Sequence, residues 1–341
     1  MSDNKGGNKG GDEKGFFGPR SVWVGIAVLA VLIFGSQAMQ PKPDPDKPPT
    51  AMRNVRIGAD MRIEELTREE CLKLPDRVWA VVGQSGNLVG KPGVECISYV
   101  ASPKAQGAET VVVFFQGDIP GKDIAEESQD KARETYQRLV DRREGELGVP
   151  VIVIGRPGVM GSSGFHINGG QRDEGQIMDV ALERVKERLG IRRLALAGQS
   201  GGARIVAQLL VIGRTDIACA AMGSGAYDVP QLQGGGRAMT NIWGNPGDRF
   251  LVPMLRAADI PPSSSRRNFI IGDPRDKVAG FAEQRAWADK LASLKHHAEL
   301  IETEGRGEEF HGTSEKSMRA AAMCAQGRSD AEIRSAVTAK E

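Results

Sequence analysis

The chain has 341 residues, of which 40% are hydrophobic and 26% are charged, and this composition allows one large globular domain with a sizeable core. Lys and Arg number 45 against 44 Asp and Glu, a formal charge of +1. No basic block with interleaved aromatic residues is present, so the sequence gives no reason to expect a nucleic-acid partner.

The N-terminal region has the pattern of a membrane-targeting segment. Residues 1–20 are rich in glycine and polar residues and lack an apolar period, which predicts a disordered cytoplasmic tail. Residues 21–39 carry no charge, and as a helix they are just long enough to cross a bilayer as an anchor. A cleaved signal peptide is the alternative, because Ser36-Gln37-Ala38 has the small residues of a cleavage site.

Residues 40–50 contain five prolines and are predicted to form an extended linker. They precede residues 51–341, which we expect to be the catalytic domain. This domain is expected outside the cytoplasm under both interpretations. It is either held at the membrane through residues 21–39, or secreted or periplasmic after cleavage behind Ala38.

Four cysteines lie in the expected catalytic domain. Outside the cytoplasm they can form disulfides. Proximity in the sequence favours Cys71–Cys96, which leaves Cys219–Cys324; four reduced, buried cysteines are the alternative. The sequence has no Cys-X-X-Cys motif and no cluster of His and Cys, so neither a metal site nor a cofactor is expected.

The domain alternates short apolar runs with longer amphipathic ones, and this alternation predicts a mainly parallel central sheet flanked by helices. The predicted strands, in chain order, are Arg77–Val82, Glu95–Val100, Thr110–Gln116, Val151–Gly155, Arg193–Ala197, Ile217–Met222, Asn268–Ile271 and Ala298–Glu302. The predicted helices are Asp123–Arg143, Gln171–Leu189, Ala203–Ile212 and Phe281–Leu294. Residues 226–267 interrupt the alternation with glycines and prolines, which indicates a lid over the site.

A Gly-X-Ser-X-Gly motif spans Gly198 to Gly202, with Ser200 at its centre. An apolar strand is predicted directly before the motif and an apolar helix directly after it, which is the context of a nucleophile elbow. The sharp turn leaves no room for side chains two residues on either side of the serine, so glycines are expected there. Ser200 is therefore the candidate nucleophile, with a helix-capping serine as the plainer alternative.

The partners of such a serine follow it in the order acid, then histidine. His311 lies in a loop after the last predicted strand, where the general base is expected. Two aspartates, Asp273 and Asp276, follow the Asn268–Ile271 strand. We favour Asp276 as the acid that orients the imidazole, because Asp273 is placed to cap the turn through Pro274.

Two backbone amides are needed to bind the oxyanion of a tetrahedral intermediate. One is expected from Gly201, the residue after the nucleophile. The other is expected from the loop after the Thr110–Gln116 strand, which makes Gly117 and Asp118 the candidates.

The segment from Thr110 to Gly312 resembles the α/β-hydrolase superfamily. The resemblance is carried by the elbow, by Gln116-Gly117-Asp118, by the loop Arg156-Pro157-Gly158 with Gly161–Gly164, by Gly272–Val278 and by Phe310-His311-Gly312. The Gly272–Val278 tract and its continuation are similar to esterases and prolyl-oligopeptidase-type members. The residue three positions after the glycine, where these members carry their acid, is Arg275 here.

The resemblance implies an α/β-hydrolase fold and a serine hydrolase of carboxylesterase or peptidase type. Its substrate would be a small ester or a peptide, cleaved through an acyl-enzyme formed on Ser200. The alternative is a binding module with the same fold and no catalysis, since a fold does not determine a function.

Overall fold

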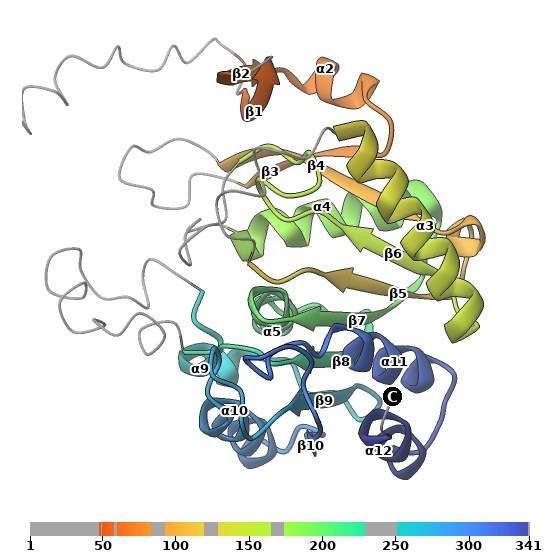
Figure 1. Ribbon diagram of the computed structural model, residues 1–341, viewed down its shortest axis with the longest axis vertical. Helices are drawn as coiled ribbons and strands as arrows, with labels where there is room; N and C mark the ends of the chain where they lie inside the picture. Colours follow the sequence, from red (N-terminus) through yellow and green to blue (C-terminus); the bar gives the residue numbers. More distant parts are fainter. Residues whose placement is uncertain are drawn as a thin grey trace, which may run out of the picture. The chain divides into compact units, whose positions relative to one another are not determined.

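An eight-stranded sheet runs through the part of the chain that the structure describes (Figure 1). The structure is a computed structural model, and it describes residues 48, 50–57, 60–82, 93–118, 129–164, 174–228 and 251–339. The strands are β3 (Arg77–Val82), β4 (Gly93–Ala101), β5 (Thr110–Phe115), β6 (Val151–Ile154), β7 (Arg193–Gln199), β8 (Ile217–Gly223), β9 (Arg267–Gly272) and β10 (Glu299–Glu302).

The sheet is mainly parallel. Its spatial order is β10-β9-β8-β7-β5-β6-β4-β3. The strands from β5 to β10 pair in parallel, whereas β4 is antiparallel to both β3 and β6. All eight strands were predicted from apolar runs, with ends that differ by at most two residues. The carboxyl ends of the parallel strands form one edge, where ligands of such sheets bind.

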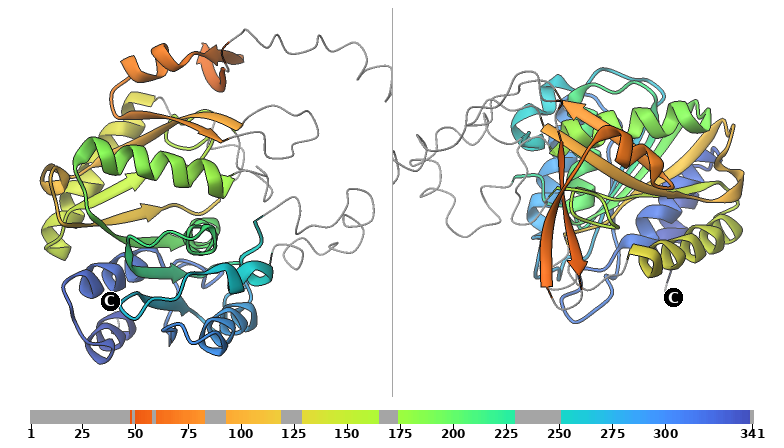
Figure 2. Two further views of the ribbon diagram at one scale, coloured as in Figure 1. Left: turned by 180° about the vertical axis from the view of Figure 1, so that it is seen from behind. Right: turned by 90° about the horizontal axis from the view of Figure 1, so that it is seen from above.

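Helices cover both faces of the sheet (Figures 1 and 2). Alternate residues of β5 point to opposite faces, so that Val111, Val113 and Phe115 belong to one core and Val112 and Phe114 to the other. The first core includes α4 (Glu174–Leu189), α5 (Gly201–Ile212) and α10 (Phe281–Ser293). The second includes α3 (Gln129–Leu147), α11 (Ser314–Ala325) and α12 (Asp330–Thr338).

Three small elements precede the sheet. The strands β1 (Ala51–Ile57) and β2 (Asp60–Leu66) pair with each other in an antiparallel hairpin. Helix α2 (Arg68–Lys73) follows and begins with a capping box, in which Thr67 and Glu70 satisfy each other's backbone amides. None of the three was predicted. Their sequences alternate charged with apolar residues over spans too short to give a clear period.

The structure corrects the predicted end of one helix. Helix α3 continues to Leu147, four residues beyond its predicted end, because Leu147 packs against the second core and the helix stops only at Gly148, with φ +68°. Residues 123–128 and 171–173, where the predicted helices began, lie outside the described residues. Helices α11 and α12 were not predicted.

The predicted lid is described only in part. Residues 251–266 contain α9 (Pro253–Arg256) and the short helix Ala257–Asp259, and they pack on α5 through Ala257 and Ile260. This part therefore belongs to the core. Residues 229–250 lie outside the described residues, as do residues 21–39 and most of the linker. No helix in the described ranges is long and apolar enough to cross a membrane.

The four cysteines form two disulfides. Cys71–Cys96 joins α2 to β4, and Cys219–Cys324 joins β8 to α11. These are the pairs that proximity in the sequence favours. The second disulfide ties the helix that follows the His311 loop to a central strand of the sheet.

Candidate active site

Ser200 lies at a sharp turn between β7 and α5, with φ 56° and ψ −124°. A non-glycine residue in this region of backbone space is strained. A Cβ on Gly198 would lie 2.4 Å from the carbonyl oxygen of Gly202, and one on Gly202 would lie 2.0 Å from that of Phe115. Only glycine fits at either position. The Ser200 side chain makes no capping hydrogen bond to α5, so its hydroxyl is not used as a helix cap.

His311 is held by Asp276. Its Nδ1 lies 3.0 Å from Oδ1 and 2.9 Å from Oδ2 of the carboxylate. Asp276 also accepts hydrogen bonds from the backbone amides of Val278 (2.9 Å) and Ala279 (3.0 Å). Burial alone would raise the pKa of Asp276, but the hydrogen bonds from His311 and the two amides outweigh it and lower the pKa. The carboxylate is therefore ionised at neutral pH.

Asp273 has different partners, although it lies only three residues away. It accepts hydrogen bonds from Nε and Nη2 of Arg275 and from the amides of Arg275 and Gly305. The Arg275 side chain above all, helped by the two amides, lowers the pKa of Asp273 to about 2. Asp273 thus fixes the turn after β9 and its contact with the loop after β10, and it does not reach the imidazole.

The elbow and the histidine loop are joined by a direct hydrogen bond. Nε2 of Gln199, the residue before Ser200, donates to the carbonyl oxygen of His311 over 3.0 Å. The segment after His311 is also anchored, since Thr313 donates to Ser224 at the end of β8 (3.1 Å). Neither contact was foreseen from the sequence, because Gln199 occupies a variable position of the elbow motif, Thr313 belongs to no motif, and both meet their partners only through the strand order.

The second ring nitrogen of His311, Nε2, is not engaged in a hydrogen bond with any described residue. Nε2 is buried and has no hydrogen-bond partner, so the structure shows no bond between it and the Ser200 hydroxyl. In sites without substrate the bond between base and nucleophile is often loose. With Nδ1 donating to Asp276, Nε2 is the atom that can accept a proton.

The loop after β5 lies against the elbow. A Cβ on Gly117 would lie 3.1 Å from Cβ of Ser200. A Cβ on Gly201 would lie 2.1 Å from Oδ1 of Asp118 and 2.6 Å from Nη1 of Arg156. All three candidate oxyanion residues therefore lie next to Ser200. Arg156, which the sequence indicated only as part of a family motif, joins them here.

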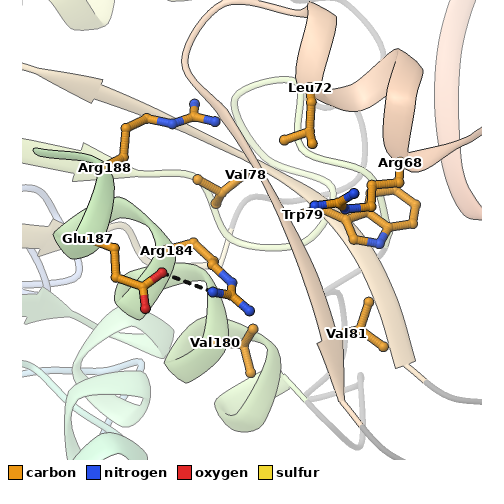
Figure 3. A pocket seen from close by; sticks show the side chains of 9 residues that line it. All are labelled: Arg68, Leu72, Val78, Trp79, Val81, Val180, Arg184, Glu187 and Arg188. Carbon is orange, nitrogen blue, oxygen red and sulfur yellow. Dashed lines mark hydrogen bonds and ion pairs between the residues drawn. The ribbon is translucent and has the colours of Figure 1, made fainter.

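The described residues also contain a cavity of about 700 Å³ between α2, β3 and α4 (Figure 3). Its lining combines apolar side chains with arginines and includes none of the candidate site residues: Arg68, Leu72, Val78, Trp79, Val81, Val180, Arg184, Glu187 and Arg188. Within the same ranges, no group of three or more His, Cys, Asp or Glu side chains is arranged to hold a metal ion.

The strand-to-helix elbow at the carboxyl edge of a mainly parallel sheet, followed along the chain by an aspartate–histidine pair, defines the α/β-hydrolase fold. The prediction of a mainly parallel central sheet flanked by helices is therefore confirmed. A lid and a membrane segment are not shown, since residues 229–250 and 21–39 lie outside the described residues.

Comparison with solved structures returns peptidases and esterases. A puromycin-hydrolysing peptidase of Mycobacterium tuberculosis is 19% identical over 78% of this chain and 43% of its own, with a TM-score of 0.45. The esterase Pf2001 of Pyrococcus furiosus is 14% identical over 75% of this chain and 90% of its own, with a TM-score of 0.43. An acylaminoacyl peptidase of Pyrococcus horikoshii is 12% identical over 77% and 43%, with a TM-score of 0.44.

This chain thus spans less than half the length of both peptidases. No protein-family profile matches the sequence, and no curated protein matches it. The assignment of the fold depends on the strand order, the elbow and the positions of the loops described above.

Proposed function

We propose that the protein is a serine hydrolase that cleaves an ester or amide bond through Ser200, His311 and Asp276. The observation that carries the proposal is the state of His311. Its Nδ1 is bound to a buried carboxylate, its Nε2 is available, and its backbone is tied to the residue before Ser200. This is the orientation that a general base needs.

The reaction follows from these positions. His311 Nε2 takes the Ser200 proton as Oγ attacks the substrate carbonyl, and the ionised Asp276 stabilises the imidazolium that forms. The amides of Gly201 and of Gly117 or Asp118 bind the oxyanion. The imidazolium then protonates the leaving alcohol or amine, and water attacks the acyl-enzyme with His311 again acting as the base.

We also propose that the domain acts outside the cytoplasm. Disulfides persist in oxidising compartments, and all four cysteines of the chain are paired in two of them. Residues 21–39 would deliver the domain, either as a membrane anchor or as a signal peptide removed behind Ala38.

One observation favours the alternative, a binding module without catalysis. Ser200 and His311 are not hydrogen-bonded to each other. A substrate panel distinguishes the two functions. A serine hydrolase cleaves at least one of a short acyl ester, a long acyl ester and an aminoacyl amide, whereas a binding module cleaves none of them.

Substitution of the two aspartates tests the proposed site. Asp276→Asn would leave His311 in place but remove the charge that sets its tautomer, and we expect kcat to fall about 10³- to 10⁴-fold. Asp273→Asn is the matched control and is expected to lower the melting temperature while leaving kcat within about twofold. Steady-state kinetics on the best of the three substrates measures both variants. An equal loss of kcat in the two variants would contradict the assignment of Asp276 as the acid. Absence of hydrolysis by the wild type would contradict the proposed function.

A further inference from the structure

We propose that Arg156 is a positioning residue of the active site. In this proposal, which rests on the proposed serine-hydrolase function, Arg156 holds the oxyanion loop against the elbow and neutralises the Asp118 carboxylate. The oxyanion loop is defined here as residues 116–118, which follow β5. The described hydrogen bonds of Arg156 reach the oxyanion loop and Glu174, and none reaches Ser200 or His311, so Arg156 would act through the loop.

Arg156 follows β6 by two residues, and its side chain is fully buried. Its Nη1 donates to Asp118 Oδ1 (2.7 Å) and to the carbonyl oxygen of Gln116 (3.2 Å). Its Nε donates to Oε1 of Glu174, at the start of α4 (2.7 Å). Two of these three bonds hold the oxyanion loop, one at each of its ends. The third hydrogen bond, to Glu174, connects Arg156 to helix α4. Arg156 thereby links the oxyanion loop to a helix that packs in the first core.

The charge of Arg156 is secure despite its burial. Burial alone would lower the pKa of the guanidinium, but Glu174 and Asp118 together raise it above its ordinary value. Arg204 on α5 adds a second positive charge, 3.9 Å from Asp118 and 3.8 Å from Glu174. Among the described residues, Arg156 and Arg204 thus both lie beside the carboxylates of Asp118 and Glu174.

The Arg156–Asp118 ion pair lies against the residue whose amide would bind the oxyanion. A Cβ on Gly201 would lie within 2.6 Å of both partners, as described above. An uncompensated carboxylate at this position would oppose the negative charge that develops in the transition state. When Asp118 is paired with Arg156, its carboxylate does not oppose that charge, because the guanidinium largely cancels its field. The cluster thus has an electrostatic role as well as a geometric one.

A second arginine offers a matched control. Arg214 is also mostly buried and bonds three carboxylates, those of Asp179, Glu183 and Asp216. Asp216 directly precedes β8, so this cluster lies at the amino ends of the strands, on the edge opposite to Ser200. Loss of Arg214 should affect stability alone.

The experiment compares Arg156→Lys, Arg156→Met, the double variant Arg156→Met with Asp118→Asn, and Arg214→Lys. Each is measured by its melting temperature, by kcat and KM on p-nitrophenyl butyrate, and by the rate of labelling with a fluorophosphonate probe. For Arg156→Met we expect kcat and the labelling rate to fall about 10²-fold, the scale of losing one oxyanion donor, with KM within about threefold.

Arg156→Lys keeps the charge without the forked geometry, so we expect a smaller loss in kcat of about tenfold. The double variant removes the charge that Arg156 neutralises, and kcat should recover about tenfold relative to Arg156→Met. Arg214→Lys should lower the melting temperature with kcat unchanged.

Three results would overturn the proposal. One is a folded Arg156→Lys variant with wild-type kcat, which also decides the matter if Arg156→Met does not fold. The second is a double variant no faster than Arg156→Met, and the third is an equal loss of kcat in Arg214→Lys. A wild-type protein that neither turns over p-nitrophenyl butyrate nor labels would contradict the proposed function itself, and the role of Arg156 with it.

Discussion

The two buried arginine clusters have similar chemistry and different surroundings. Arg156 and Arg214 each gather carboxylates from separate elements, and in both cases these partners outweigh burial and raise the pKa of the guanidinium. Arg156 lies at the carboxyl edge of the sheet beside the elbow, and Arg214 lies at the amino edge. The difference teaches that the position of an ion cluster relative to the strand ends, and not its composition, indicates whether it can serve the site.

The clusters differ in the exposure of one partner. The Arg156 side chain is fully buried and that of Glu174 is 4% exposed, whereas Asp118 is 40% exposed, which is comparable with Asp179 and Glu183 beside Arg214, at 28% and 44%. Ion pairs that water reaches contribute little to stability. A buried pair costs much free energy when only one partner is removed. Loss of one partner of the buried Arg156–Glu174 pair should therefore destabilise the fold more than loss of Asp179 or Glu183.

Among changes at the two clusters, the largest effect is expected at Gly201, which contacts the Arg156 cluster. Gly201→Ala would place a methyl group on the Arg156–Asp118 pair and force the oxyanion loop away from the elbow. We expect kcat to fall by at least about 10²-fold, the scale of losing one oxyanion donor. Ester hydrolysis by the folded variant measures this loss.

Gly213 is the corresponding glycine at the Arg214 cluster. Its φ is +104°, and a Cβ there would meet only Pro261, at 3.7 Å. Gly213→Ala should therefore cost about 1–2 kcal/mol of stability through backbone strain and leave kcat unchanged. A loss of kcat equal to that of Gly201→Ala would show that the two edges of the sheet do not differ as described.

The smallest effect is expected for Asp216→Asn in the Arg214 cluster. Burial would raise the pKa of Asp216, but hydrogen bonds from Arg214 and Lys186 outweigh it and lower the pKa. A lowered pKa stabilises the fold above the unfolded value of about 4, and this contribution is lost as the pH falls through the folded value.

The variant should thus lose about 1 kcal/mol at pH 7, and its difference from wild type should shrink below about pH 4. Urea unfolding at pH 7 and at pH 3 measures the two differences. If wild type and variant differed in their free energy of unfolding by the same amount at pH 7 and at pH 3, the proposed role of the ionised Asp216 carboxylate would be contradicted.

The sheet and the elbow could be predicted because each rests on a local signal. The strand Thr110–Gln116 is a continuous apolar run, and Gly198 and Gly202 flank Ser200 at the spacing that the turn requires. Helices α11 and α12 follow the last strand, where no further alternation indicated that the fold continues. The apolar residues of α11 and α12 pack into the second core, and this packing partner is visible only in the folded structure.

The sequence favours Asp276 over Asp273 as the acid, but the contacts that separate the two aspartates could not be derived from it. Asp273 and Asp276 follow the same strand, and either could reach a nearby imidazole on spacing alone. The structure separates them through Arg275, whose side chain folds back onto Asp273, and through the turn that directs Asp276 toward His311. The Arg156 cluster was missed for a similar reason, because its members are 18 to 86 residues apart and meet only through the strand order.

Covalent labelling of Ser200 is the most direct test of the central claim. The purified protein is treated with a fluorophosphonate probe and digested, and the modified residue is located by mass spectrometry. We expect one adduct, on Ser200, that is lost in Ser200→Ala and slowed strongly in His311→Ala. Folded wild-type protein that carries no adduct, or an adduct that persists in Ser200→Ala, would contradict the assignment of Ser200 as the nucleophile.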